Sequence, residues 1–159
     1  MLSPGLTPPQ LLPTLAQGPG IVAQQPAKSE VRLLLHRISA GFPSPAADYA
    51  DEGLDLNTYL VRNKPATFMF IVRGDSVIGA GIFDGDIVVV DRSVRAKHKD
   101  IVVAVVDAEY TIKRLYKFRG RVELHPENPK YQPITFTEDS TLEIWGVVVG
   151  VVRRYPAKG

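Results

Sequence analysis

The chain has 159 residues, 45% hydrophobic and 23% charged, as expected of a single globular domain with a hydrophobic core. Its 19 Lys and Arg against 17 Asp and Glu give a net charge of +2, too even to indicate nucleic-acid binding by charge alone. Cysteine is absent and the three histidines are scattered, so neither a metal nor a cofactor is predicted. No apolar run approaches the roughly 20 residues of a membrane span, and we expect a cytoplasmic protein.

Residues 1–27 differ from the rest of the chain. They hold six of the 13 prolines and no charged residue. Proline at this density blocks helices and strand ladders, which predicts a flexible arm. Four apolar side chains in this segment can still pack on another surface, namely Leu11, Leu12, Ile21 and Val22.

Three features are predicted between this arm and residue 63. The apolar run 31–38 is a candidate edge strand. Residues 40–45 form a proline-rich, extended segment, the backbone form that a protease cleft accepts. Residues 51–63 carry apolar side chains at helical spacing, with Asp48 and Asp51 as candidate caps and Pro65 beyond the end, and predict one helix.

The remainder of the chain alternates short apolar runs with turns. The sequences Asp84-Gly85-Asp86 and Asp107-Ala108-Glu109 are typical of tight turns. This pattern predicts a compact, mostly β fold of short, mainly antiparallel strands with one short helix. The expected strands are 67–72, 87–90, 101–106, 110–115, 121–124, 134–136 and 142–153.

Ser76 and Lys113 are the candidate catalytic residues. Ser76 follows Gly74-Asp75 at the end of a predicted strand, where the backbone can turn and present the hydroxyl. A serine needs a nearby base, and burial of Lys113 in an apolar strand would favour its neutral amine. His98 is a second candidate base, but no sequence context supplies a Ser–His–Asp arrangement. By residue chemistry alone, Ser76 is more often a turn residue and Lys113 a solvent-facing one.

Several blocks in one order resemble the UmuD-type branch of the LexA-like (S24) peptidase family. The Ser76-to-Lys113 separation of 37 residues and the Gly41-to-Ser76 separation of 35 also agree with that family. Two positions depart from it, since Val77 replaces the usual Met and Ala40 replaces a frequent Cys. The matching blocks are 41–49, 55–57, 74–76, 84–86, 96–102, 110–115 and 143–148.

The resemblance implies self-cleavage between Ala40 and Gly41. It makes Ser76 the nucleophile, with its backbone N–H helping to hold the oxyanion, and Lys113 the general base. Residues 1–40 would be the removed arm and 41–159 the β domain. The resemblance also implies a homodimer, stimulation by the RecA–single-stranded DNA filament, and a UmuC-type Y-family polymerase as partner in SOS translesion synthesis.

Three other functions compete with this one. A LexA-type repressor needs a helix-turn-helix, which we do not expect in 39 proline-broken residues, so no sequence-specific DNA binding is predicted. A signal peptidase needs a membrane anchor. A non-catalytic dimeric polymerase-accessory module with a vestigial Ser/Lys pair is the alternative that stays open.

Overall fold

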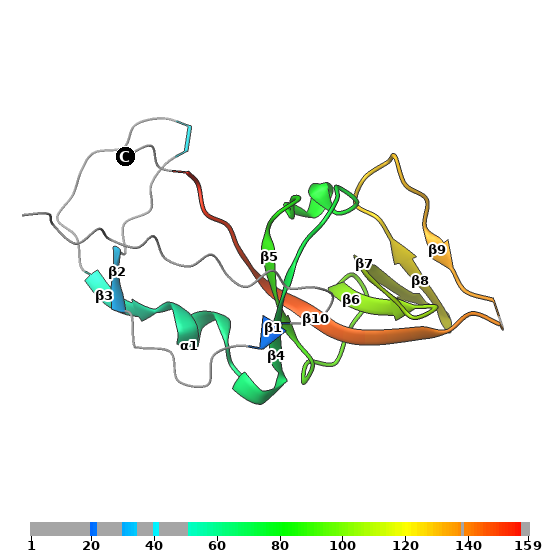
Figure 1. The fold of residues 1–159 in the computed structure, drawn as a ribbon, viewed down its shortest axis with the longest axis horizontal. Coiled ribbons are helices and arrows are strands. Elements are labelled where there is room, and N and C mark those ends of the chain that lie inside the picture. The colour runs from blue at the N-terminus through cyan, green and yellow to red at the C-terminus, as the bar shows by residue number, and fades with distance from the viewer. Residues whose placement is uncertain (1–19, 22–29, 35–39, 42–50, 138, 157–159) are drawn as a thin grey trace, which may run out of the picture.

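The computed structural model describes residues 20–21, 30–34, 40–41, 51–137 and 139–156. Within them lie ten strands, one short α-helix and two 3-10 helices (Figure 1). The elements are β1 Gly20–Ile21, β2 Glu30–Leu34, β3 Asp51–Asp55, α1 Leu56–Leu60, η1 Lys64–Ala66, β4 Thr67–Ile71, η2 Ile78–Ala80, β5 Ile87–Asp91, β6 Ile101–Val106, β7 Glu109–Phe118, β8 Arg121–His125, β9 Ile134–Thr135 and β10 Leu142–Val152.

One antiparallel sheet organises the domain. Its strand order is β1-β4-β5-β10-β6-β7-β8-β9, and β2 pairs with β3 in a separate two-stranded sheet. The long strand β10 therefore joins the β4–β5 half to the β6–β8 half, and it sweeps across the centre of the fold in Figure 1. Its register shifts once against each neighbour, at residues 144–146 and 148–150, and such bulges bend and twist a strand.

Strand alternation distributes the core over both faces of the sheet. In β6, Val103 belongs to one buried cluster, whereas Val102 and Ala104 belong to the other, as the two-residue side-chain period requires. The first cluster contains Val72, Val77, Ile82, Val88, Val90, Val103 and Trp145, and the second Val102, Ala104, Leu115, Leu124 and Val147. Because the first cluster includes Val77, the residue after Ser76 is anchored in the core, where its exposure is 0%.

The prediction of a mostly antiparallel β fold with one short helix is confirmed. The seven strands predicted after residue 66 are present, and residues 107–108 form the β6–β7 turn, with φ of 47° and 69°. Paired positive φ values match the right-handed twist of a hairpin.

The extent of the helix was predicted wrongly. Residues 51–55 form β3, and α1 covers only Leu56–Leu60. Asp55 is the N-cap, its carboxylate accepting from the Asn57 N–H at 3.0 Å, so the helix begins there. The helix ends at Val61, whose backbone is extended before the 3-10 turn that contains Pro65.

The expectation that residues 1–27 form no strand is wrong at Gly20–Ile21. These two residues pair with Met69 and Phe68 of β4. They lie between Pro19 and Pro26 and keep their own N–H groups, so they can add to a sheet edge. The rest of the predicted arm lies outside the described residues.

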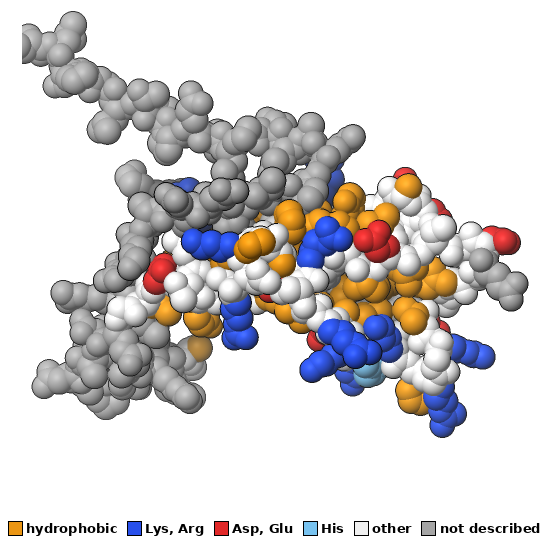
Figure 2. Space-filling model, turned by 90° about the horizontal axis from the view of Figure 1, so that it is seen from below, with side chains coloured by type: hydrophobic (Ala, Val, Ile, Leu, Met, Phe, Trp, Pro, Cys, Tyr) orange, Lys and Arg blue, Asp and Glu red, His pale blue; other side chains and the backbone are white. Residues whose placement is uncertain are grey.

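Two features of the described residues bear on function. Lys and Arg side chains gather on one part of it, next to a histidine (Figure 2). Among the residues that the structure describes, no helix is long and apolar enough to cross a membrane.

Candidate active site

Ser76 lies in a turn between β4 and the 3-10 helix η2. Gly74 has φ of +88°, which a side-chain-bearing residue rarely adopts, so the chain can reverse immediately before the serine. The Gly74 N–H donates to Asp84 Oδ1 at 2.6 Å. Ser76 is half-buried and Val77 is fully buried. The turn is therefore held on both sides of the hydroxyl.

Lys113 reaches the same point from β7. Its Nζ lies 3.0 Å from Ser76 Oγ, 2.9 Å from Thr111 Oγ1 and 3.1 Å from the Ile112 carbonyl oxygen. These three oxygens fix the position of the amine. The structure thus brings together the serine and the lysine that are 37 residues apart in the chain.

Burial lowers the pKa of the Lys113 amine. Desolvation disfavours the charged form of the amine. A cavity of about 240 Å³ adjoins the pair, with mostly apolar and aromatic walls. Its lining residues are Phe70, Ile71, Val72, Arg73, Ser76, Val88, Val103, Tyr110, Thr111, Ile112 and Lys113.

A loop after β8 holds the turn that carries Ser76. The Glu127 N–H donates to the Ser76 carbonyl at 2.8 Å, and the Gly79 N–H donates to the Glu127 carbonyl at 2.8 Å. Buried Asn128 donates through Nδ2 to the Asp75 carbonyl at 2.9 Å. The backbone on both sides of Ser76 is therefore fixed by this loop, which we call the clamp loop (residues 126–131).

The clamp loop is also tied to the strand that carries Lys113. Arg114 donates through Nε to Glu127 Oε1, an ion pair with both side chains about three-quarters buried. Because Glu127 contacts both Arg114 and the Ser76 carbonyl, it links the two sides of the Ser76–Lys113 pair.

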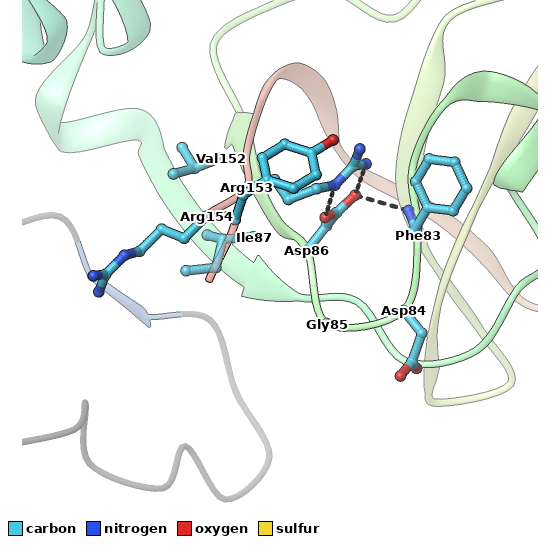
Figure 3. A pocket seen from close by; sticks show the side chains of 9 residues that line it. Phe83, Asp84, Gly85, Asp86, Ile87, Val152, Arg153 and Arg154 are labelled. Carbon is cyan, nitrogen blue, oxygen red and sulfur yellow. Dashed lines mark hydrogen bonds and ion pairs between the residues drawn. The ribbon is translucent and has the colours of Figure 1, made fainter. Parts of the chain in front are cut away.

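The Asp84-Gly85-Asp86 turn is anchored by the end of β10. Arg153 donates through Nε to Asp86 Oδ1 at 2.6 Å and through Nη2 to Asp86 Oδ2, and its guanidinium lies 4.4 Å above the Phe83 ring (Figure 3). The hydrogen bonds from Arg153 lower the pKa of Asp86, which is only 3% exposed. Asp84, in the same turn, accepts from the Gly74 N–H, so this anchor supports the turn that carries Ser76.

The other predicted residues lie apart from this pair. Ala40 and Gly41 are exposed and are not among the described residues that line the cavity. The His98 ring packs edge-on against Tyr116, and its Nδ1 accepts from the Lys117 N–H, so it does not serve Ser76.

Sequence reasoning missed Thr111, the clamp loop and Arg153. The only signal for the clamp loop was Asn128-Pro129, which marks a turn but not its partner. The position of Thr111 was predictable, because it is two residues before Lys113 and strand residues two apart share a face. Arg153 is 67 residues from Asp86, and no local pattern joins them.

A serine hydroxyl next to a desolvated amine, beside an apolar cavity, is an arrangement suited to acyl transfer. Comparison with known proteins agrees with this chemistry. The model of the family described as Peptidase S24-like matches residues 32–149. Since that match covers most of the chain, the protein belongs to the S24 peptidase family.

Individual relatives place the chain within the family. It is 44% identical to Protein SamA of Salmonella typhimurium over 131 residues, 82% of this chain and 91% of SamA. It is 44% identical to Protein MucA of Escherichia coli, over 77% of this chain and 84% of MucA. A LexA repressor of Syntrophotalea carbinolica is 52% identical over 88 residues, 55% of this chain and 44% of the repressor. The predicted UmuD-like membership of the LexA-like S24 family is confirmed.

Proposed function

We propose that this protein is a self-cleaving Ser–Lys peptidase that cuts its own chain between Ala40 and Gly41. The observation that carries the proposal is the 3.0 Å contact between Ser76 Oγ and the Nζ of a lysine whose pKa is lowered by burial. An ordinary surface lysine is protonated at neutral pH and cannot accept a proton. Membership of a peptidase family supports the same chemistry.

In the proposed reaction, the neutral Lys113 amine takes the Ser76 hydroxyl proton as Oγ attacks the Ala40 carbonyl carbon. The tetrahedral intermediate collapses, the Ala40–Gly41 bond breaks, and protonated Lys113 gives its proton to the Gly41 amine. Water then attacks the Ala40 ester with Lys113 again as base, which releases the Ala40 carboxylate and restores Ser76. The Ser76 N–H is proposed as an oxyanion donor.

Cleavage requires residues 40–41 to occupy the cavity beside Ser76, which they do not line in this structure. The docking equilibrium of the segment therefore sets the rate, because an intramolecular substrate reacts only in the docked geometry. We propose that the RecA–single-stranded DNA filament favours the docked state. The product, residues 41–159, would form a homodimer that joins a UmuC-type Y-family polymerase in SOS translesion synthesis in the cytoplasm.

The test is intact-mass spectrometry of the full chain incubated with RecA, single-stranded DNA and a nucleotide analogue. The expected result is a new species that begins at Gly41, absent from matched Ser76→Ala and Lys113→Ala proteins. Incubation at alkaline pH without RecA is a second arm, because a larger neutral fraction of Lys113 raises the rate of cleavage each time the segment docks without the activator. An unchanged mass in both arms would overturn self-cleavage and favour a non-catalytic polymerase-accessory module.

A further inference from the structure

A cluster of positive charge lies at the β7–β8 hairpin, away from Ser76. Two segments supply it, residues 95–99 and residues 117–121, each with three Lys or Arg and no Asp or Glu. The segments are in contact, because Lys117 donates through its backbone N–H to His98 Nδ1 and through Nζ to the Ala96 carbonyl. All six cations are exposed, and Figure 2 shows Lys and Arg gathered beside a histidine. We call this surface the hairpin patch.

Aromatic rings lie within the hairpin patch. A cavity of about 380 Å³ is lined by His98, Tyr116, Phe118, Arg121 and Glu123. Tyr116 already stacks on His125 at 4.0 Å, so its ring is partly covered. Phe118 is 64% exposed, with the Arg119 guanidinium 5.0 Å from its ring centre. An aromatic ring exposed among cations is the kind of side chain on which an unpaired base can stack.

Two carboxylates, Glu123 and Asp100, border the six cations of the patch. Glu123 is the one carboxylate among the cavity-lining residues, and its Oε2 contacts His125 Nε2 at 2.6 Å. Asp100 Oδ2 accepts from the Lys97 N–H. The whole chain carries only +2, so six cations in one place are a local excess that attracts a polyanion.

We propose that the hairpin patch binds single-stranded nucleic acid without sequence preference. Cations that follow the phosphates and exposed aromatic rings on which unpaired bases stack are the two components of such sites. Paired bases of a duplex present no free face to Phe118, so single strands are preferred. An acidic protein would use the cations but gains nothing specific from a ring suited to base stacking. The proposal goes beyond the proposed peptidase function and does not depend on it.

The experiment measures binding of a fluorescently labelled 20-nucleotide oligothymidylate by anisotropy, with the full-length Ser76→Ala chain, which cannot change by cleavage during the measurement. Three variants are compared in that background. Phe118→Leu removes the stacking face and Phe118→Tyr keeps it. The double variant Arg119→Asn/Arg121→Gln removes two charges, with Asn chosen because Arg119 has φ of +48°. Arg62→Gln/Arg154→Gln, two exposed cations outside the patch, is the charge-matched control.

We expect Phe118→Leu to weaken binding about 5- to 100-fold and Phe118→Tyr to retain it. The double charge variant should reduce the slope of log affinity against log salt by about 1.4, or roughly 0.7 for each phosphate that is no longer neutralised. The control variant should bind as the parent does. Far-UV circular dichroism of every variant checks that the fold is kept.

Three results would overturn the proposal. The first is no binding of the oligonucleotide at low salt. The second is equal weakening by the patch variant and the Arg62/Arg154 control, which would mean unspecific attraction. The third is a poly-glutamate peptide that competes as well as the oligonucleotide while Phe118→Leu has no effect, which would assign the patch to an acidic protein.

Discussion

The Gly79→Ala substitution tests whether the clamp loop positions Ser76, the proposed nucleophile. A Cβ at this position would lie 2.6 Å from the Glu127 carbonyl oxygen and 3.3 Å from the Glu127 Cβ. The nearer atom belongs to the backbone and cannot rotate away. Separation to about 3.0 Å, the shortest contact that real Cβ atoms make, requires a movement of at least about 0.4 Å. Since the Glu127 N–H donates to the Ser76 carbonyl, the movement is transmitted to Ser76.

Two magnitudes follow from this geometry. Alanine reduces the entropy of the unfolded chain, worth about 0.4–1 kcal/mol, while the forced contact costs about 1–3 kcal/mol, so the net loss of unfolding free energy lies between about 0 and 2.6 kcal/mol. A misplacement of about 1 Å costs roughly 100-fold in rate, so a shift near half of that predicts about a 10-fold slower cleavage.

The assay follows the full-length chain by intact-mass spectrometry at alkaline pH without RecA, well below the melting temperature. Gly150→Ala is the matched control, because its Cβ would meet the tip of the Leu60 side chain at 2.9 Å, and that side chain can move aside. We expect the control to cleave at the rate of the parent protein. If Gly79→Ala also cleaves within twofold of the parent, the clamp loop does not position Ser76 and the reasoning is wrong.

Three more predictions concern pH and the core. The rate of cleavage should rise with pH to a plateau, and the midpoint of that rise should lie below the pKa of an ordinary lysine, because burial lowers the Lys113 pKa. A midpoint at the ordinary value would contradict the assignment of Lys113 as base. The Arg153 hydrogen bonds hold the Asp86 pKa below its ordinary value. This pair therefore contributes stability above pH 4, and that stability is lost as pH falls through the lowered pKa. In thermal melts from pH 6 to 2, the melting temperature should fall less in Asp86→Asn than in the parent. Leu115→Ala, at a site with 0% exposure, should lower the free energy of unfolding by about 2–5 kcal/mol in urea titration, and a loss under 1 kcal/mol would mean that the second core cluster is not closely packed.

The local order of the chain determined most of the β architecture. Alternating apolar residues and turn residues such as Asp107-Ala108 are patterns that span only a few positions of the sequence, so the strands after residue 66 were predictable. The helix was overextended because Leu54 is the one apolar side chain in residues 51–55, and a single apolar residue fixes neither a helical nor a strand period. Their pairing with residues 30–34 decided the strand, and that partner is remote in sequence.

For the site, the sequence by itself offered Ser76 and Lys113 only as candidates, and the resemblance to the S24 family, rather than residue chemistry, was the reason to pair them. Only the tertiary structure decided the 3.0 Å contact, the desolvation of the amine, and the clamp loop that joins Arg114 to the Ser76 backbone. It also gathered cations from residues 95–99 and 117–121 into one patch on a chain whose overall charge is nearly balanced. Burial and charge density depend on which strands become neighbours, and in an antiparallel sheet that is set by contacts between residues far apart in the chain.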